Sequence, residues 1–139
     1  PHLDSYCNAR RNAARFYNKA FANHPNIITP TATSYNTSNC GEICAVCDCH
    51  VFHQYTLQIT NGKRDDLHQH LLDKEIPNAI YYPVALHAQK AYKDSRYKES
   101  DFPVTNALIK TVISLPMHTE LTEEQLTFIT QTILNFLAN

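Results

Sequence analysis

The chain has 139 residues, 43% of them hydrophobic, and 12 basic side chains nearly balance 13 acidic ones. This length suits a single domain with one core, and the small net charge argues against nucleic-acid or anionic-membrane partners. No apolar run approaches the roughly 20 residues of a membrane span, and the first residues lack the regions of a signal peptide, so we expect a cytoplasmic protein. The sequence opens without Met, which leads us to expect a segment upstream of it.

The first half of the chain predicts one helix and two strands. Residues 4–23 predict a helix, because apolar side chains recur every three or four residues. Residues 27–28 predict a short strand, and residues 30–49 have no period and predict a long loop. Residues 50–59 alternate and are rich in β-branched and aromatic side chains, which predicts a strand. The expected inner face of the helix consists of Ala9, Ala13, Phe16, Tyr17, Ala20 and Phe21.

The second half predicts two further helices and two short strands. A helix is expected over residues 63–74, followed by a strand over residues 79–82 that the next proline closes. A third helix begins at Pro103, and a strand over residues 112–115 follows it. The expected inner faces are Leu67, Leu71 and Leu72 in the first of these helices, and Val104, Ala107, Leu108 and Thr111 in the second.

The last helix has the most complete set of signals. Thr122 and Gln125 have the spacing of a capping box, and Leu121 and Leu126 have the spacing of a hydrophobic staple. The apolar stripe of this helix consists of Leu126, Ile129, Ile133, Leu134 and Leu137. Taken together, the elements predict an α+β fold: a small three- to four-stranded sheet with helices mainly on one face.

Five polar or aromatic residues are candidates for a binding site. His53 and Tyr55 lie in the strongest predicted strand, while Tyr81 and Tyr82 end the next one and His87 follows them. Each of them alone is more typical of a half-buried structural residue. A tyrosine pair directly before a proline is different, because the proline ends the strand and places the pair at the rim of the sheet. Two other histidines, His68 and His70, are expected on the solvated side of their helix.

Four cysteines crowd into the predicted loop as C-x3-C-x2-C-x-C: Cys40, Cys44, Cys47 and Cys49. Four thiolates provide enough ligands for Zn²⁺ or an iron-sulfur cluster. The spacing is irregular, however, since a zinc knuckle has two well-separated pairs. The main alternative for the whole chain is an autonomous metal-binding module. If no metal binds, the four cysteines are free thiols in a surface insertion.

Several strings occur in the order and spacing of a known family. They are residues 52–56 (FHQYT), 62–65 (GKRD), 80–84 (IYYPV) with Leu86, His87 and Gln89, 115–118 (LPMH) and 120–125 (ELTEEQ). The chain thereby resembles the C-terminal third of the DegT/DnrJ/EryC1/StrS sugar aminotransferases. Residues 3–17 are similar to the helix that leads into that domain, so the resemblance covers nearly all of the chain.

The resemblance implies a fold-type I aminotransferase that acts as a homodimer. Such an enzyme moves an amino group from an amino acid, usually glutamate, to a ketone on a nucleotide-linked sugar. A lysine of the large domain holds pyridoxal phosphate as a Schiff base. Residues 1–139 would then be the C-terminal small domain without its N-terminal large domain. We expect no cofactor-binding or catalytic residue here, and no turnover by this chain alone.

The resemblance also implies which residues bind substrate. The family's aromatic pair before proline matches Tyr81 and Tyr82, and His87, His53 and Tyr55 are weaker candidates. The small domain would form one wall of the nucleotide-sugar cleft, so the interpretation fails if the tyrosine pair lies in the core. A third alternative is a stand-alone sugar-binding protein. The sequence leaves open which sugar carbon is aminated and which nucleotide carries the sugar.

Overall fold

The computed structural model describes residues 2–31 and 50–138. The helices are α1 (Leu3–Ala20), α2 (Arg64–Asp73), α3 (Pro103–Leu108) and α4 (Glu123–Ala138), and the strands are β1 (Ile27–Ile28), β2 (Tyr55–Ile59) and β3 (Val112–Leu115). Three short 3₁₀ helices lie between α2 and α3: Leu86–Ala88, Lys90–Tyr92 and Glu99–Asp101. The α+β prediction is confirmed, with three strands in the sheet.

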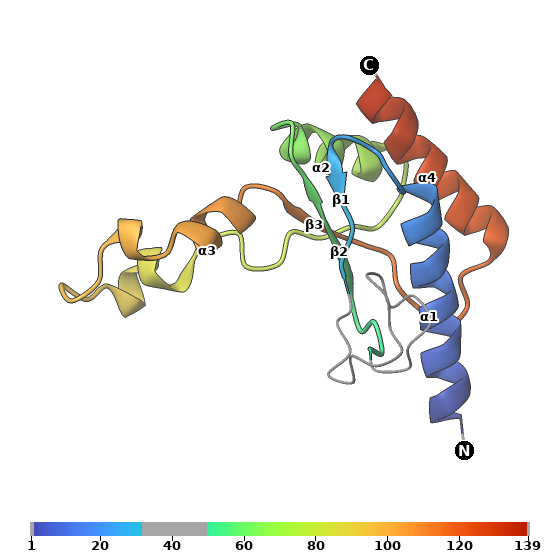
Figure 1. Ribbon diagram of the computed structural model, residues 1–139, viewed down its shortest axis with the longest axis horizontal. Helices are drawn as coiled ribbons and strands as arrows, with labels where there is room; N and C mark the ends of the chain where they lie inside the picture. Colours follow the sequence, from blue (N-terminus) through green and yellow to red (C-terminus); the bar gives the residue numbers. More distant parts are fainter. Residues whose placement is uncertain (1, 32–49, 139) are drawn as a thin grey trace.

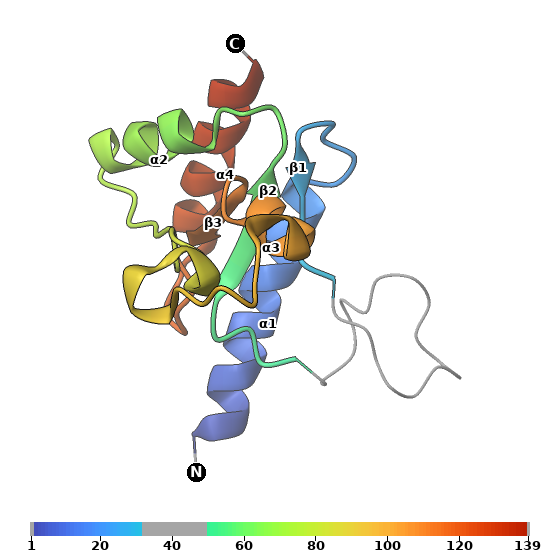
Figure 2. The same ribbon diagram turned by 90° about the vertical axis from the view of Figure 1, so that its left-hand side faces the viewer.

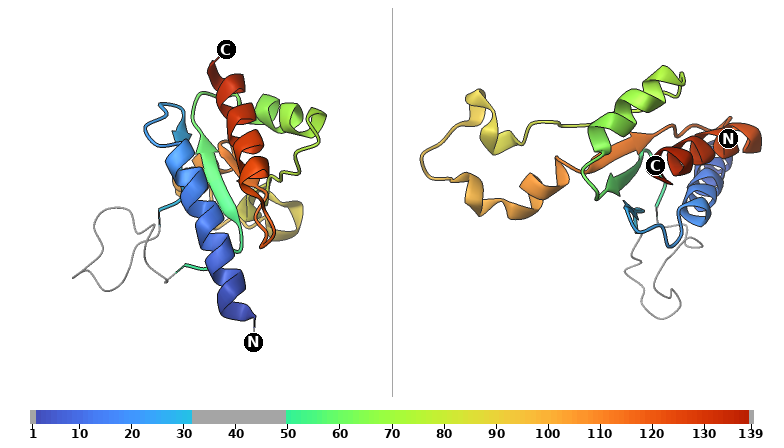
Figure 3. Two further views of the ribbon diagram at one scale, coloured as in Figure 1. Left: turned by 90° about the vertical axis from the view of Figure 1, so that its right-hand side faces the viewer. Right: turned by 90° about the horizontal axis from the view of Figure 1, so that it is seen from above.

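The three strands form an antiparallel sheet in the order β1-β2-β3. Its register pairs Ile59 with Ile27 on one side, and Leu57 with Ile113 on the other. Helices α1 and α4 lie side by side over one face of the sheet (Figures 1 and 3). The helices therefore shield this face, as the sequence predicts.

The core lies between that face and the helices. Every second residue of β2 is fully buried, which is the pattern of a sheet with one covered face. Helices α1 and α4 contribute the apolar sides that their periodicity predicts, and α2 contributes Leu67 and Leu71. Leu72 is exposed instead, because it lies on the outer side of α2. Among the described residues, no helix is long and apolar enough to cross a bilayer.

Helix α4 begins as its sequence predicts. The amide of Thr122 donates to Gln125 Oε1 (2.9 Å), and the amide of Gln125 donates to Thr122 Oγ1 (3.2 Å), which closes the capping box. Leu121 and Leu126 flank this cap and both pack against the core. The start of α4 is therefore fixed by residues that are close together in the sequence.

Two predicted strands are shorter than expected, each for a local reason. The strand predicted over residues 50–59 begins only at Tyr55, because Phe52 has a left-handed backbone (φ 47°) and its amide donates to His50 Nδ1 (3.0 Å). The strand predicted over residues 79–82 is reduced to a single bridge between Ala79 and Ser114. Tyr82 also has a left-handed backbone (φ 57°), which is incompatible with an extended strand.

Residues 80–111 form an arm that leaves the body of the domain (Figures 1 and 2). Helix α3 lies on this arm, and the prediction that its apolar side faces a core is wrong. Val104 is 69% exposed, and Ala107 and Leu108 are exposed as well. Thr111 is half-buried and caps the end of α3, where its hydroxyl donates to the carbonyls of Leu108 (3.3 Å) and Ala107 (3.4 Å). The helix period predicted α3 itself, but it could not show that this helix lies away from the core.

The arm is nonetheless ordered by contacts of its own. Ala85 is buried, and the ring of His87 stacks on Phe102 at 4.4 Å between centroids. The side-chain amide of Asn106 donates to the carbonyl of Glu99 (2.7 Å). These contacts hold the arm together as a small folded unit.

Candidate functional site

A small pocket lies at the end of the sheet where the chain enters β2 and leaves β3. Its volume is about 230 Å³. It is lined by His53, Gln54, Pro77, Asn78, Ala79, Tyr81, Ser114, Leu115, Pro116 and Met117. We call this the sheet-end pocket, and it brings together two of the predicted site residues, His53 and Tyr81.

The predicted tyrosine pair is accessible. Tyr81 is 48% exposed and contributes to the lining of the sheet-end pocket, and Tyr82, 82% exposed, follows it just outside the lining. A left-handed backbone at a bulky residue costs about 1–3 kcal/mol and is retained where the surrounding structure or a function requires it. Tyr82 has this backbone, and the proline after it disfavours the ordinary helical alternative. The pair is therefore held at the rim in a fixed local conformation.

His53 and Tyr55 have opposite environments although they are two residues apart. His53 is exposed at the pocket, before the strand begins. Tyr55 is fully buried in the core, where its hydroxyl donates to Asn18 Oδ1 (2.7 Å) and its ring lies 4.8 Å from the ring of Tyr17. Burial, and in second place the neighbouring phenol of Tyr17, raises the pKa of Tyr55 above its usual value. This placement gives Tyr55 a structural role, and the phenol has no access to the pocket.

His87 lies on the arm and does not line the sheet-end pocket. Its ring is half-buried against Phe102, and its Nε2 atom is buried with no hydrogen-bond partner among the described residues. The structure thus places His87 apart from His53 and Tyr81.

Asn78 is a pocket residue that the sequence did not reveal. Its side-chain amide donates to the carbonyls of Ile76 (3.1 Å) and His68 (3.5 Å), so its Oδ1 atom faces His68 Nδ1 at 2.5 Å. His68 is half-buried in this contact, and His70 is half-buried against the ring of Phe136 (4.9 Å between centroids), so the expectation of solvated side chains is wrong for both histidines. Asn78 lies ten residues after His68, in a segment for which the sequence predicts no regular structure. The adjacent Pro77 is the only signal near Asn78 in the sequence.

Comparison with known proteins identifies the family. A model of the DegT/DnrJ/EryC1/StrS aminotransferase family matches residues 1–134. The chain belongs to this family. It is 33% identical over 126 residues to a UDP-N-acetyl-3-dehydro-alpha-D-glucosamine 3-aminotransferase of Acidithiobacillus ferrooxidans, covering 91% of this chain and 30% of that protein. It is also 33% identical to a pleiotropic regulatory protein of Geobacillus stearothermophilus, over 98% of this chain and 33% of that protein.

Two solved structures have the same fold as this chain. The family member from Brucella abortus superposes with a TM-score of 0.79 at 30% identity, and covers 99% of this chain. DesV of S. venezuelae, solved in complex with a ketimine intermediate, superposes with a TM-score of 0.81 at 25% identity and covers 99% of this chain. In both cases the match spans 33% of the other protein. The chain thus spans about a third of the length of the relatives it matches.

The lysines of this family member do not fit the role of a cofactor lysine. A Schiff-base lysine is activated by desolvation or by a neighbouring cation. All seven lysines lie in the described ranges, and six of them are exposed. Lys63 is half-buried, with its ammonium group 6.0 Å from the centroid of the Phe136 ring. No lysine described here has the surroundings that would hold pyridoxal phosphate covalently.

The predicted cysteine cluster is not part of the described structure. Cys40, Cys44, Cys47 and Cys49 all fall within residues 32–49, outside the described residues. In the parts that are described, no group of three or more His, Cys, Asp or Glu side chains could hold a metal ion. The metal-binding alternative therefore stays a prediction about that loop.

Proposed function

We propose that this chain is the C-terminal small domain of a pyridoxal-phosphate-dependent aminotransferase and forms one wall of the cleft for a nucleotide-linked ketosugar. The observation that carries the proposal is the exposed pair Tyr81 and Tyr82 at the rim of the sheet-end pocket. The strained backbone of Tyr82 supports it, because such strain clusters at ligand sites. Relatives named as UDP-sugar and dTDP-sugar aminotransferases support the substrate class.

The chemistry of the rim suits a sugar nucleotide. A phenol ring has an apolar face that packs on a pyranose ring, and a hydroxyl that bonds to sugar hydroxyls or phosphate oxygens. His53, which also lines the pocket, adds an imidazole. The volume of about 230 Å³ is below the roughly 300–1,000 Å³ of complete small-molecule sites. The opposite wall would therefore be provided by another domain.

We assign the cofactor and the amino donor to that larger domain. Pyridoxal phosphate bound there supplies the electron sink for amino transfer, and glutamate is the proposed donor. Because the lysines of this chain are exposed or only half-buried, the chain by itself is expected to be inactive. The complete enzyme would be a cytoplasmic homodimer. His87 would serve this site only if the arm moves or a partner approaches it.

The first experiment asks whether a large domain exists. The coding sequence that precedes Pro1 should encode a domain of roughly 200 residues or more, within the usual range of domain size, with a lysine suited to a Schiff base. The chain alone should not interconvert the pyridoxal and pyridoxamine forms of the cofactor, whereas the two-domain protein should. An upstream sequence without such a domain would contradict the proposal.

The second experiment tests the tyrosine pair in the two-domain protein. Tyr81→Ala and Tyr82→Ala should each raise the KM for a nucleotide-linked ketosugar about tenfold, the equivalent of one good contact. Tyr92→Ala is the matched control, because Tyr92 is an exposed tyrosine on the same arm, outside the lining of the sheet-end pocket. If neither substitution at the rim changes KM, the proposed wall is wrong.

A further inference from the structure

We infer that α2 fixes the root of the arm, and that Arg64 and His68 are positioning residues for the wall of the sheet-end pocket. The root of the arm is defined as residues 78–79, where the chain leaves the body, and residues 111–112, where it returns. The functional part of this inference rests on the proposed function, because the pocket wall matters only if a substrate binds there. The structural part stands on contacts within this chain.

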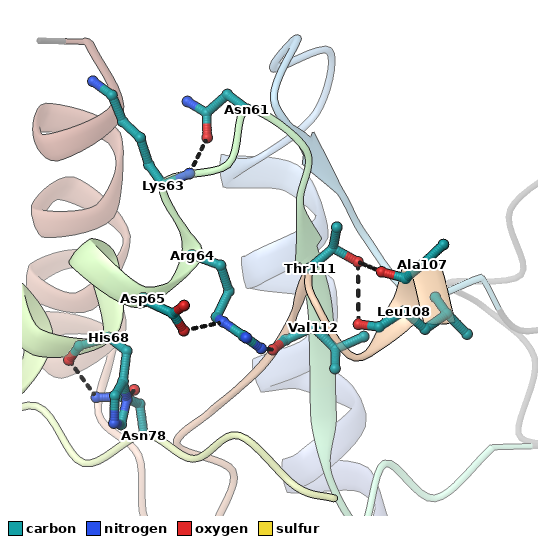
Figure 4. Close-up of polar contacts among 10 residues, drawn as sticks. All are labelled: Asn61, Lys63, Arg64, Asp65, His68, Asn78, Ala107, Leu108, Thr111 and Val112. Carbon is teal, nitrogen blue, oxygen red and sulfur yellow. Dashed lines mark hydrogen bonds and ion pairs between the residues drawn. The ribbon is translucent and has the colours of Figure 1, made fainter. Parts of the chain in front are cut away.

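Arg64 takes the place of a missing strand at the outer edge of β3. Ala79 pairs with Ser114 through two backbone hydrogen bonds (3.1 and 2.8 Å), and this isolated bridge is the only backbone pairing at that edge among the described residues. The carbonyl of Val112 points to the same edge, because residues two apart in a strand present their backbone groups on the same side. Arg64 Nη1 donates to this carbonyl at 2.9 Å (Figure 4). A side chain thus completes a pairing that the short strand leaves open.

The environment of Arg64 makes this contact specific. The residue is only 7% exposed, and its guanidinium group is also paired with Asp65, with Nε 2.7 Å from Oδ1. A buried cation needs both charge neutralisation and satisfied donors. Asp65 provides the first and helps with the second, and the Val112 carbonyl accepts a charge-assisted hydrogen bond, which is stronger than a neutral one. The guanidinium group is therefore held at the returning end of the arm.

His68 holds the other end of the root. The amide group of Asn78 donates to two carbonyls, so its Oδ1 atom is the acceptor that faces the imidazole. His68 Nδ1 must then carry the proton in this hydrogen bond. Asn78 lines the sheet-end pocket together with Tyr81, three residues further along the chain. His68 thereby positions the pocket wall through Asn78 without lining the pocket itself.

Both contacts come from one side of a rigid helix. Arg64 and His68 are four residues apart and so share a face of α2. Leu67 and Leu71 of the same helix are fully buried in the core. The helix is thus anchored to the body of the domain and connects it to both ends of the arm (Figure 4). This arrangement makes the direction of the arm depend on two side chains.

The structural part is tested on the 139-residue chain by amide hydrogen exchange. His68→Leu and Arg64→Met remove the donors and keep much of the side-chain volume. Each should speed exchange at the amides of Ala79 and Ser114 by about five- to tenfold, the effect of losing one hydrogen bond, while α4 amides are unchanged. His68→Asn keeps a donor at the position of Nδ1 and should restore slow exchange. Gln69→Ala, which removes an exposed contact on the same helix, is the control.

A second readout follows the arm itself. The chain has no tryptophan, so Tyr92→Trp introduces a single reporter at an exposed position of the arm. In this background His68→Leu should lower the fluorescence anisotropy, because the arm gains motion independent of the body. Unchanged exchange in both donor-deleted variants, together with unchanged anisotropy in His68→Leu, would overturn the inference.

The functional part is tested in the two-domain enzyme by steady-state kinetics. His68→Leu should raise the KM for the ketosugar about fivefold with little change in kcat, and His68→Asn should restore it. If exchange quickens while KM stays constant, and Tyr81→Ala still raises KM, the positioning role is refuted and the proposed function survives. If Tyr81→Ala and Tyr82→Ala leave KM unchanged, the proposed function is refuted, whatever exchange shows at the root.

Discussion

Replacing Tyr55 with phenylalanine should halve the alkaline loss of stability that we predict for this chain. Tyr17 and Tyr55 are both fully buried, with their rings 4.8 Å apart. Their hydroxyls donate to the carbonyl of Pro116 (3.0 Å) and to Asn18 Oδ1 (2.7 Å). Burial raises the pKa of both phenols well above the usual value, and the proximity of Tyr17 raises that of Tyr55 further. The folded chain therefore keeps both protons in a range where the unfolded chain loses them.

The sign and the size of the effect follow from proton linkage. An unfolded tyrosine loses its proton near pH 10, so above that pH the folded state binds more protons than the unfolded state. Stability then falls as pH rises, by about 1.4 kcal/mol per pH unit for each such tyrosine. Two buried tyrosines give twice this slope, about 2.8 kcal/mol per pH unit. In Tyr55→Phe only Tyr17 contributes, so the slope should be about 1.4 kcal/mol per pH unit.

The assay is urea unfolding followed by circular dichroism at several values between about pH 9 and pH 11.5, on either side of the tyrosine reference value. Both proteins contain the same other ionisable groups, so the difference between the two slopes cancels their contribution. Tyr92→Phe, at an exposed ring, is the matched control and should keep the parent slope. Equal slopes for Tyr55→Phe and the parent would refute the placement of Tyr55 in the core.

Other substitutions test the fold, the rim and the metal alternative. Thr122→Ala removes the cap of α4 and should cost about 1 kcal/mol in urea unfolding; an unchanged midpoint would contradict the capping box. Ile133→Ala should lower the free energy of unfolding by about 2–5 kcal/mol, because Ile133 is buried. Val104→Ala on the exposed arm should change it by no more than about 0.5 kcal/mol. Similar losses for the two substitutions would place α3 in the core. Tyr82→Asn should raise the free energy of unfolding by about 1 kcal/mol, because asparagine tolerates the left-handed backbone. The same substitution should weaken ketosugar binding in the two-domain enzyme. A fall in both the free energy of unfolding and the affinity for ketosugar would contradict the strain argument. A chelator should leave the unfolding midpoint unchanged, and a large fall would favour a metal site in the cysteine loop.

The parts of the fold that the sequence predicts well are those with short-range causes. The start of α4 depends on Thr122 and Gln125, three residues apart, and its buried stripe follows from the helix period. The strand predicted over residues 112–115 is confirmed with the bounds of β3. In these cases the residues that decide the structure are neighbours in the chain.

The errors have two causes: a local departure of the backbone from a regular pattern, and an apolar face that no other element covers. Alternation continues from residue 50 to residue 59, but the left-handed backbone of Phe52 and its hydrogen bond to His50 keep the first half out of the sheet. Helix α3 has an apolar side like any core helix, yet it lies on an arm and exposes that side. Periodicity identifies an apolar face, but it does not indicate whether another element covers that face.

The candidate site shows the same division. The resemblance to a family identified Tyr81 and Tyr82, and the proline after them predicted a position at the rim; both rings are exposed there. The contacts that hold this rim are of another kind, because Arg64 reaches a carbonyl 48 residues away and His68 reaches a side chain ten residues away. No local pattern marks such pairs, and only the folded chain brings them together. The binding surface proposed for this arm would need such support, since an arm with so few core contacts would otherwise lose the orientation of its two exposed rings.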